Sequence, residues 1–151
     1  MANPLNDFLS SSTLKATRQL TEAFALLPAD KRDWSPGGTA RTALDQLAEC
    51  VATNNYVATQ LMNRVAPAFD TYEADKATAF AAGDKLPALL LASAERLAEA
   101  IQNVPDTDWQ IVLETPDGGM VLADVAGLPY WNMSYHEGQV NYILAILGLQ
   151  E

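Results

Sequence analysis

The longest helical pattern in the chain runs from about residue 39 to residue 65. Side chains recur there at spacings of three and four, and they form one continuous stripe of Ala43, Leu44, Leu47, Val51, Asn54, Ala58, Leu61 and Val65. A helix with such an apolar face is stable in water when other elements cover that face. This stretch therefore predicts a helix that packs its full inward face inside a bundle.

Three other long segments also have the period of a helix. The first covers about residues 12–27, the second covers residues 86–104, and the last runs from near Pro129 to about Leu147. Proline is tolerated in the first turn of a helix, where its missing N–H has no partner to lose. Gly148 is then placed to end the last helix.

Shorter elements are predicted between these helices. Residues 70–84 read as a loop followed by a short helix that Gly83 closes, and Asp84 is a candidate cap for the helix that follows. After Pro105 the period changes, and two β-prone runs flank Asp117-Gly118-Gly119, which is a hairpin signal. The 151 residues thus predict one all-α domain over residues 1–151, a four-helix bundle with a short β-hairpin before the last helix.

Composition narrows the class of partner. The net charge of −10 repels phosphate backbones and anionic lipid, so neither nucleic acid nor a membrane surface is expected as a partner. The most apolar stretch, residues 86–101, contains Glu95 and Arg96 and does not read as a membrane span. No signal peptide is indicated, and the single cysteine, Cys50, cannot form an intrachain disulfide. A cytoplasmic protein is therefore expected.

The last helix carries a polar face within its apolar surroundings. Asn132, His136 and Gln139 fall on one side of the stretch YWNMSYHEGQVNYIL, and His136 is the only histidine in the chain. A buried polar group costs a few kcal/mol unless it is hydrogen-bonded. The pattern predicts a polar pocket, bound water or a ligand. Tyr135 and Trp131 are candidate walls of that pocket, although aromatic side chains at this spacing also serve as packing.

The helix predicted over residues 39–65 offers side chains to face this stripe. Asn54 falls near the centre of its apolar face and Cys50 lies one turn earlier, so both are expected to point inward. Glu49 falls almost opposite and reads as a solvated charge. We therefore expect Asn54 and His136 to line the same cavity. The alternative for His136 is a core histidine that Asn132 or a backbone carbonyl satisfies.

Two quoted stretches resemble a known family. LPADKRDWSPGGTARTALDQLAECVATNNY is similar to the opening of the DinB-like, or YfiT-like, damage-inducible four-helix bundle proteins. YHEGQVNYILAILG resembles their last helix, whose signature is roughly His-x-x-x-His-x-x-Gln followed by Leu-x-Gly. The resemblance follows the order of the helices along nearly the whole chain. It implies the DinB-like four-helix bundle as the fold.

The resemblance also implies a metal site. Family members commonly hold a divalent metal, such as zinc, nickel or manganese, with one histidine on the second helix and two on the last. His136 matches the second histidine of the last helix, Asn132 takes the place of the first, and Gln139 matches the glutamine. The second-helix position falls on Glu49 or Cys50. Two of the three histidines are therefore absent, and the implied metal site is altered.

Either residue remains a candidate for the second-helix position. The helical wheel favours Cys50 because it points inward, whereas ligand chemistry favours Glu49 because a carboxylate binds zinc, manganese or nickel well. A buried cysteine is also often an inert, small apolar residue. The sequence leaves both assignments open.

Two functions follow from these observations. The resemblance implies a metal-dependent hydrolase or thiol transferase that acts on a small molecule through an altered metal site. His136, Asn132 and Glu49 or Cys50 would be the ligands, and Gln139, Asn54, Tyr135 and Trp131 would line the pocket. The alternative is a non-catalytic protein that binds a small ligand or a partner after loss of the metal. Such a protein would be a homodimer that uses exposed apolar helix surface.

Overall fold

The computed structural model describes residues 3–115 and 118–150, and most of them are helical. Five α-helices and one antiparallel pair of strands follow each other along these residues. Their bounds are α1 Pro4–Ala25, α2 Ala43–Asn63, α3 Phe69–Ala81, α4 Leu86–Gln102, β1 Val112–Thr115, β2 Gly118–Val121 and α5 Leu122–Ile146. Short 3-10 turns lie at Ala29–Lys31, Gly83–Lys85 and Asp106–Asp108.

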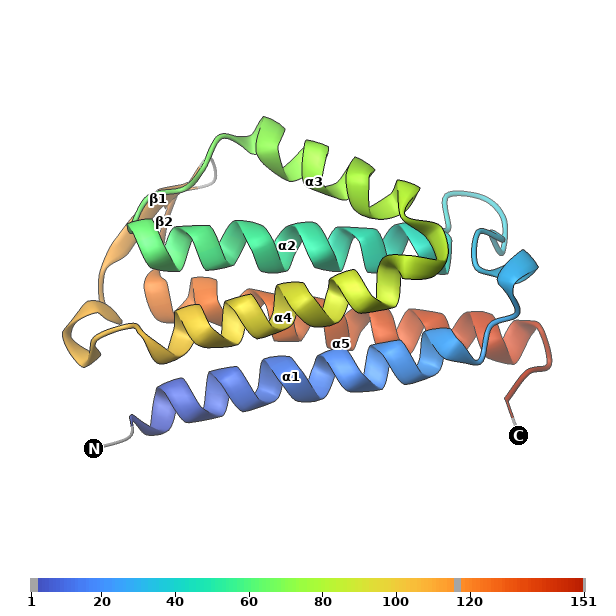
Figure 1. The fold of residues 1–151 in the computed structure, drawn as a ribbon, viewed down its shortest axis with the longest axis horizontal. Helices are drawn as coiled ribbons and strands as arrows, with labels where there is room; N and C mark the ends of the chain where they lie inside the picture. The colour runs from blue at the N-terminus through green and yellow to red at the C-terminus, as the bar shows by residue number, and fades with distance from the viewer. Residues whose placement is uncertain (1–2, 116–117, 151) are drawn as a thin grey trace.

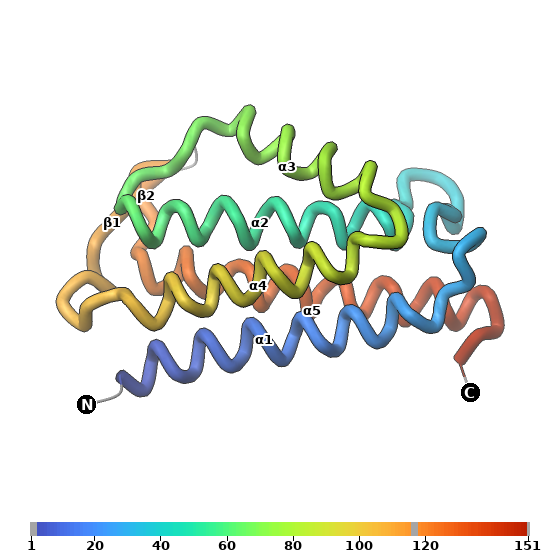
Figure 2. Tube along the Cα trace, viewed as in Figure 1, coloured from blue at the N-terminus to red at the C-terminus, as the bar shows by residue number. Residues whose placement is uncertain are grey.

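The four long helices form the bundle, and α3 lies against the outside of α2 (Figure 1). α1 packs on α4 and α5, and α2 also packs on α4 and α5, so the consecutive helices α1 and α2 stand diagonally. The tube in Figure 2 shows that α1 and α5 run in one direction, and that α2 and α4 run in the other. The predicted all-α bundle with a hairpin before the last helix is confirmed, and its wiring is not a simple up-down-up-down order.

α1 begins at Pro4 and not near residue 12, so its predicted start was wrong. Its first turn is capped by Asn3, whose side chain accepts a hydrogen bond from the Leu5 amide at 2.8 Å. The inward face of this turn includes the polar residues Asn6 and Ser10, which are buried. Polar residues on the inward face interrupt the apolar period of the sequence. The prediction, which used that period, therefore placed the helix start too late.

α5 begins at Leu122, which places Pro129 in the helix interior and not in the first turn as predicted. Strand β2 leads directly into this helix. The amide of Leu122 donates to the carbonyl of Ile111 at 2.8 Å, and the amide of Ala123 donates to that of Trp109 at 3.3 Å. Because these bonds satisfy donors that a free helix end would leave open, the helix can start without a proline. Pro129 is buried in the bundle.

The turn predictions have mixed outcomes. The hairpin is present, with Val112 opposite Val121 and Thr115 opposite Gly118, while Asp117 of the predicted turn lies outside the described residues. Gly83 has a φ of +55° just after α3, as expected of a residue that closes a helix. Asp84, however, does not cap α4 but pairs with Arg32 across the end of the bundle.

The core is apolar along its length and divides into two clusters. One surrounds Leu20, Phe24 and Leu47 near the α1–α2 connection, and the other surrounds Leu61 and Trp109 near the hairpin. The inward stripe predicted for α2 is buried from residue 43 to residue 61 apart from the half-buried Leu44. Within the described residues, none of the helices has both the length and the apolar character needed to cross a bilayer.

A buried asparagine joins α1 to the end of α4 and to the segment before the hairpin. Asn6 donates to the carbonyls of Ile101 and Val104, both at 3.0 Å, and accepts from the indole N–H of Trp109 at 2.9 Å. The side chain is 4% exposed, so water cannot replace these partners. Asn6 therefore fixes the start of α1 against the far end of the bundle.

Replacing Asn6 by alanine should lower the free energy of unfolding by about 2 to 4 kcal/mol, because three buried polar groups lose a partner together. Urea denaturation measures this loss. Asn103→Ala is the matched control, since Asn103 is exposed and donates only to the carbonyl of Glu99. Equal losses in the two variants would contradict the structural role of Asn6.

Candidate functional site

Facing side chains of α2 and α5 meet at the Glu49 carboxylate. Glu49 Oε1 lies 3.2 Å from His136 Nε2 and 3.2 Å from Asn132 Nδ2, which donates to it. Cys50 Sγ donates to Asn132 Oδ1 at 3.3 Å. The antiparallel contact of α2 with α5 thus brings together Glu49, Cys50, Asn132 and His136, the four residues that the sequence suggested as metal ligands.

Glu49 is not the solvated charge that the helical wheel predicted. Its side chain is 20% exposed and is directed between α2 and α5. The other carboxylate oxygen pairs with Arg41, and α3 covers the outer side of α2. Cys50 is fully buried, as predicted. Both candidates for the second-helix position therefore reach Asn132, but Glu49 is the one that hydrogen-bonds His136.

His136 has a partner at each ring nitrogen. Its side chain is 3% exposed, with Nδ1 2.7 Å from Gln139 Oε1 and Nε2 3.2 Å from Glu49 Oε1. A doubly protonated ring donates to both oxygens, whereas a neutral ring satisfies both contacts only if Gln139 turns its amide to present its NH₂ group. Glu49 and Gln139 orient the ring, and Asn132, expected as its partner in the core alternative, bonds Glu49.

A chain of ion pairs extends from His136 to α3. Glu49 pairs with Arg41, Arg41 pairs with Asp45, and Asp45 pairs with Lys76 at 3.1 Å. We call these four residues together with His136 the Glu49 network. Two carboxylates and two permanent cations balance in it when the imidazole is neutral. The network therefore carries its own counter-charges.

The network perturbs the acidity of two groups in opposite directions. Burial raises the pKa of Glu49, but hydrogen bonds from His136 and Asn132 and the charge of Arg41 outweigh that effect and lower it to about 2. Burial and the Glu49 charge raise the pKa of the Cys50 thiol well above its ordinary value. Glu49 is therefore a carboxylate at neutral pH, and Cys50 remains a thiol that can only donate weakly.

The residues at Glu49 fit a divalent metal only in part. Glu49 Oε1 and His136 Nε2 are 3.2 Å apart, a spacing that two ligands of one ion can have when each bond is about 2.0 to 2.2 Å. Asn132, however, directs its NH₂ group at Glu49, and Arg41 holds the other carboxylate oxygen. Over residues 3–115 and 118–150, no group of three His, Cys, Asp or Glu side chains could hold a metal ion. As they lie, these side chains do not fit a resident metal.

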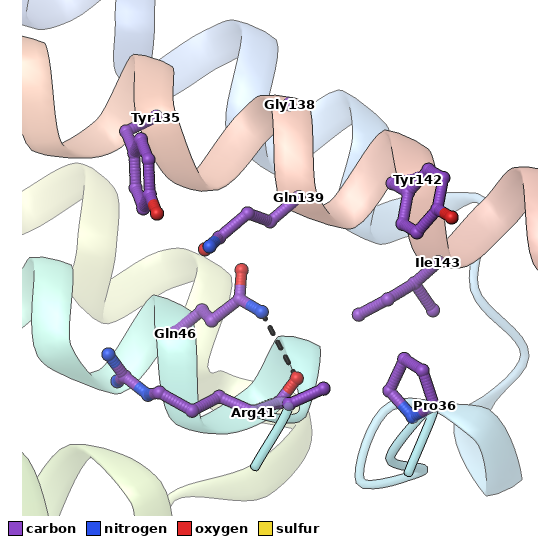
Figure 3. Close-up of a pocket in the computed structure, with 9 residues that line it drawn as sticks. Pro36, Arg41, Gln46, Tyr135, Gly138, Gln139, Tyr142 and Ile143 are labelled. Carbon is purple, nitrogen blue, oxygen red and sulfur yellow. Dashed lines mark hydrogen bonds between the residues drawn. The ribbon is translucent and has the colours of Figure 1, made fainter. Parts of the chain in front are cut away.

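A cavity of about 420 Å³ opens beside the network, between the start of α2 and the second half of α5 (Figure 3). Gln46 and Gln139 point toward one another across it. Gln46 is 3% exposed and donates to the carbonyl of Arg41 at 3.1 Å, but its Oε1 has no hydrogen-bond partner among the described residues. The lining is Pro36, Ala40, Arg41, Gln46, Tyr135, Gly138, Gln139, Tyr142 and Ile143.

Only two of the four residues suggested as pocket walls line this cavity. Gln139 and Tyr135 line the cavity, and Trp131 is 60% exposed and stacks on Tyr135 at 5.6 Å between ring centroids. Asn54 is buried in the core, donates to Ser93 Oγ at 3.0 Å, and does not line this cavity.

Two residues of the site escaped the sequence analysis. Gln46 lies one turn before Glu49 and Cys50, so the helical spacing of three and four places it on their side of α2. That spacing was the available signal. Arg41 lies just before the start of α2 and pairs with Glu49, and no local sequence pattern indicated this pairing.

Comparisons with known proteins identify the fold. No family model matches the chain, and no curated protein matches it. The solved structure of YfiT from Bacillus subtilis, described as a probable metal-dependent hydrolase with an unusual four-helix bundle topology, superposes with a TM-score of 0.78 over 98% of this chain and 90% of that one. The sequence identity is 12%.

A second solved structure is similar as well. The mycothiol-dependent maleylpyruvate isomerase superposes with a TM-score of 0.72 at 13% identity over 91% of this chain. This chain spans 61% of that protein, which is less than two thirds of its length. At such identities the likeness establishes the fold, which is the DinB-like four-helix bundle that the sequence predicted.

The lowered pKa of Glu49 predicts a pH-dependent contribution to stability. Because the folded-state pKa of about 2 lies below the ordinary value of 4.5, this contribution is complete above pH 4.5 and is lost as the pH falls toward 2. Urea denaturation should show Glu49→Gln to be less stable than the wild type by about 2 to 3 kcal/mol at pH 7, with the difference shrinking in that acidic window.

Glu95→Gln on α4 is the control, because Glu95 is exposed. The difference in the free energy of unfolding between Glu95→Gln and the wild type should stay near zero at both pH 7 and pH 2. A Glu49→Gln difference that does not change between pH 7 and pH 2 would contradict the ion pairing described for Glu49.

Proposed function

We propose that this chain is a small-molecule-binding protein on the DinB-like fold, in which a charge-balanced network replaces the metal site that the resemblance implies. The observation that carries the proposal is the pairing of Glu49 with both His136 and Arg41. Arg41 and Lys76 already neutralise the two carboxylates, so a divalent cation would add charge that no further carboxylate in the network offsets.

The cavity beside the network supplies the binding site in this proposal. Its volume of about 420 Å³ is within the range of small-molecule pockets. The unpartnered Oε1 of Gln46 costs about 1 to 3 kcal/mol while it has no donor, and a ligand N–H would recover that energy. Tyr135 and Tyr142 offer aromatic walls, so a flat ligand with a carboxamide-like edge suits the site.

The second candidate is a metal-dependent hydrolase or a thiol-dependent transferase. It is supported by the printed description of YfiT and by the 3.2 Å spacing of Glu49 Oε1 and His136 Nε2. His136, Glu49 and Asn132 would hold zinc, nickel or manganese, and Asn132 would have to turn its amide so that Oδ1 replaces the NH₂ group that now faces Glu49. Gln139 would keep the imidazole oriented through Nδ1.

Metal analysis separates the two candidates. Protein purified without a histidine tag should contain no stoichiometric zinc, nickel or manganese by mass spectrometry. Titration calorimetry with each ion should show no binding at micromolar concentration, because the network has no open pair of ligands. Stoichiometric metal that is lost in His136→Ala, with the fold intact by circular dichroism, would overturn the proposal in favour of the metalloenzyme.

Benzamide is a suitable probe of the cavity, since its carboxamide can donate to Gln46 Oε1 while its ring lies between the tyrosines. We expect saturable shifts of the amide resonances of α5 residues around Gln139 in NMR titrations at millimolar benzamide. Gln46→Leu should weaken the affinity about tenfold, which corresponds to one lost hydrogen bond in a buried site.

Gln60→Leu is the matched control for Gln46→Leu. Gln60 is also a buried glutamine of α2, with 5% exposure, but it does not line this cavity. Its substitution should leave the benzamide affinity that the resonances around Gln139 report within about twofold of the wild type. Equal effects of the two substitutions, or no saturable shifts around Gln139, would contradict the assignment of this cavity as the binding site.

A further inference from the structure

A second cavity, of about 530 Å³, lies on the other side of the Glu49 network. On α2 it begins at Thr53, one turn after Glu49, and on α5 it ends at Leu128, one turn before Asn132. α3 and the hairpin supply the remaining walls. The lining is Thr53, Tyr56, Val57, Gln60, Ala66, Pro67, Phe69, Tyr72, Thr115, Met120, Val125 and Leu128.

The position of α3 creates this space. α3 diverges from α2 toward its own N-terminal end, as Figure 1 shows, and Ala79 near its C-terminal end is its only buried residue. Three aromatic side chains stand at the diverging end. Tyr72 is stacked on Phe69 at 5.2 Å and meets Tyr56 edge-on at 5.9 Å, so these rings support each other as a wall.

The cavity contains few polar groups, and most of them are already bonded. Thr53 and Tyr72 share a hydroxyl contact at 3.4 Å, and Tyr56 donates to the carbonyl of Pro67 at 2.8 Å. Gln60 differs from these groups, because it is 5% exposed and supplies the one side-chain amide among the lining residues. A side-chain amide in such a wall can both donate a hydrogen bond to a ligand and accept one from it.

Charge is absent from this wall. None of the twelve lining residues is Asp, Glu, Lys, Arg or His. An ionised ligand would lose its hydration here without meeting a counter-charge, which costs several kcal/mol. A neutral, largely apolar molecule meets no such cost. The cavity volume of about 530 Å³ is within the range of ordinary ligand pockets.

We propose that this second cavity binds one uncharged, largely apolar small molecule whose single hydrogen-bonding group pairs with the Gln60 amide. The site is separate from the cavity that Gln46 lines, and it does not depend on whether a metal is bound at Glu49. The aromatic wall of α3 packs on the ligand, and the Gln60 amide sets its orientation.

The test uses N-phenyl-1-naphthylamine, a neutral fluorophore whose emission rises in apolar surroundings and whose N–H can donate to Gln60. The wild type should bind it saturably at one site. Leu128→Trp, which fills the cavity, should weaken binding about tenfold or more. Leu89→Trp is the matched control, because Leu89 has 38% exposure against 39% for Leu128 and lines none of the described cavities, so its affinity should not change.

A charged analogue tests the ligand class. 8-Anilinonaphthalene-1-sulfonate has the same two ring systems and an added sulfonate, so it should bind about tenfold more weakly than the neutral probe. Equal binding of the two probes would overturn the proposal. The same holds if the neutral probe does not bind saturably, or if Leu128→Trp and Leu89→Trp behave alike.

A second pair of variants removes the dependence on Leu128→Trp. Phe69→Ala takes away an exposed ring of the cavity wall, and Phe8→Ala removes a ring of similar exposure on α1. Circular dichroism checks that each variant is folded. Phe69→Ala should weaken binding of the neutral probe severalfold, and Phe8→Ala should leave it unchanged. Gln46→Leu should also have no effect, because Gln46 lines the other cavity. Loss of binding in Phe8→Ala or Gln46→Leu would contradict the assignment.

Discussion

The Glu49 carboxylate is the point on which the α2–α5 interface depends. It is largely buried, and such a charge is costly unless partners surround it. Arg41 reaches one oxygen from just before α2, while His136 and Asn132 reach the other from α5. These contacts join α2 and α5, which run antiparallel as α1 and α4 also do, whereas α1 with α5 and α2 with α4 run in parallel. These contacts thus join α2 to α5 at a point that lies between the two cavities.

The network also separates the two cavities chemically. Gln46 lines the one toward the start of α2, and Gln60 lines the other, about 21 Å further along the helix axis. The first lies beside Arg41 and two tyrosines, whereas the second has no ionisable acid or base among its lining residues apart from tyrosine hydroxyls. Each is lined by one buried glutamine, and Gln46 Oε1 has no hydrogen-bond partner among the described residues. The charged network thus lies between the two cavities and borders the first of them through Arg41.

The sequence predicted the helices best where packing is purely apolar. The stripe of α2 up to Leu61 and the hairpin follow from side-chain period and turn residues, and both are confirmed, whereas Val65 of the predicted stripe lies beyond the end of α2 and is exposed. The starts of α1 and α5 were missed, because Asn6 makes a buried polar contact that interrupts the apolar pattern of α1 and because Pro129 resembles a helix start. Tertiary hydrogen bonds fix the start of each of these two helices. Glu49 was misplaced for a related reason, since a long side chain can reach an interface that its Cα does not face.

The Asn132 amide links the two neighbouring side chains of α2 in the site. It donates to Glu49 from one end and accepts from Cys50 at the other. The Cys50 thiol donates to Asn132 Oδ1, so Asn132 provides its partner without another charge. Arg41 then supplies the positive charge that a metal would otherwise bring to Glu49. Each of these features stabilises the others, and together they favour a closed hydrogen-bond network over an open set of metal ligands.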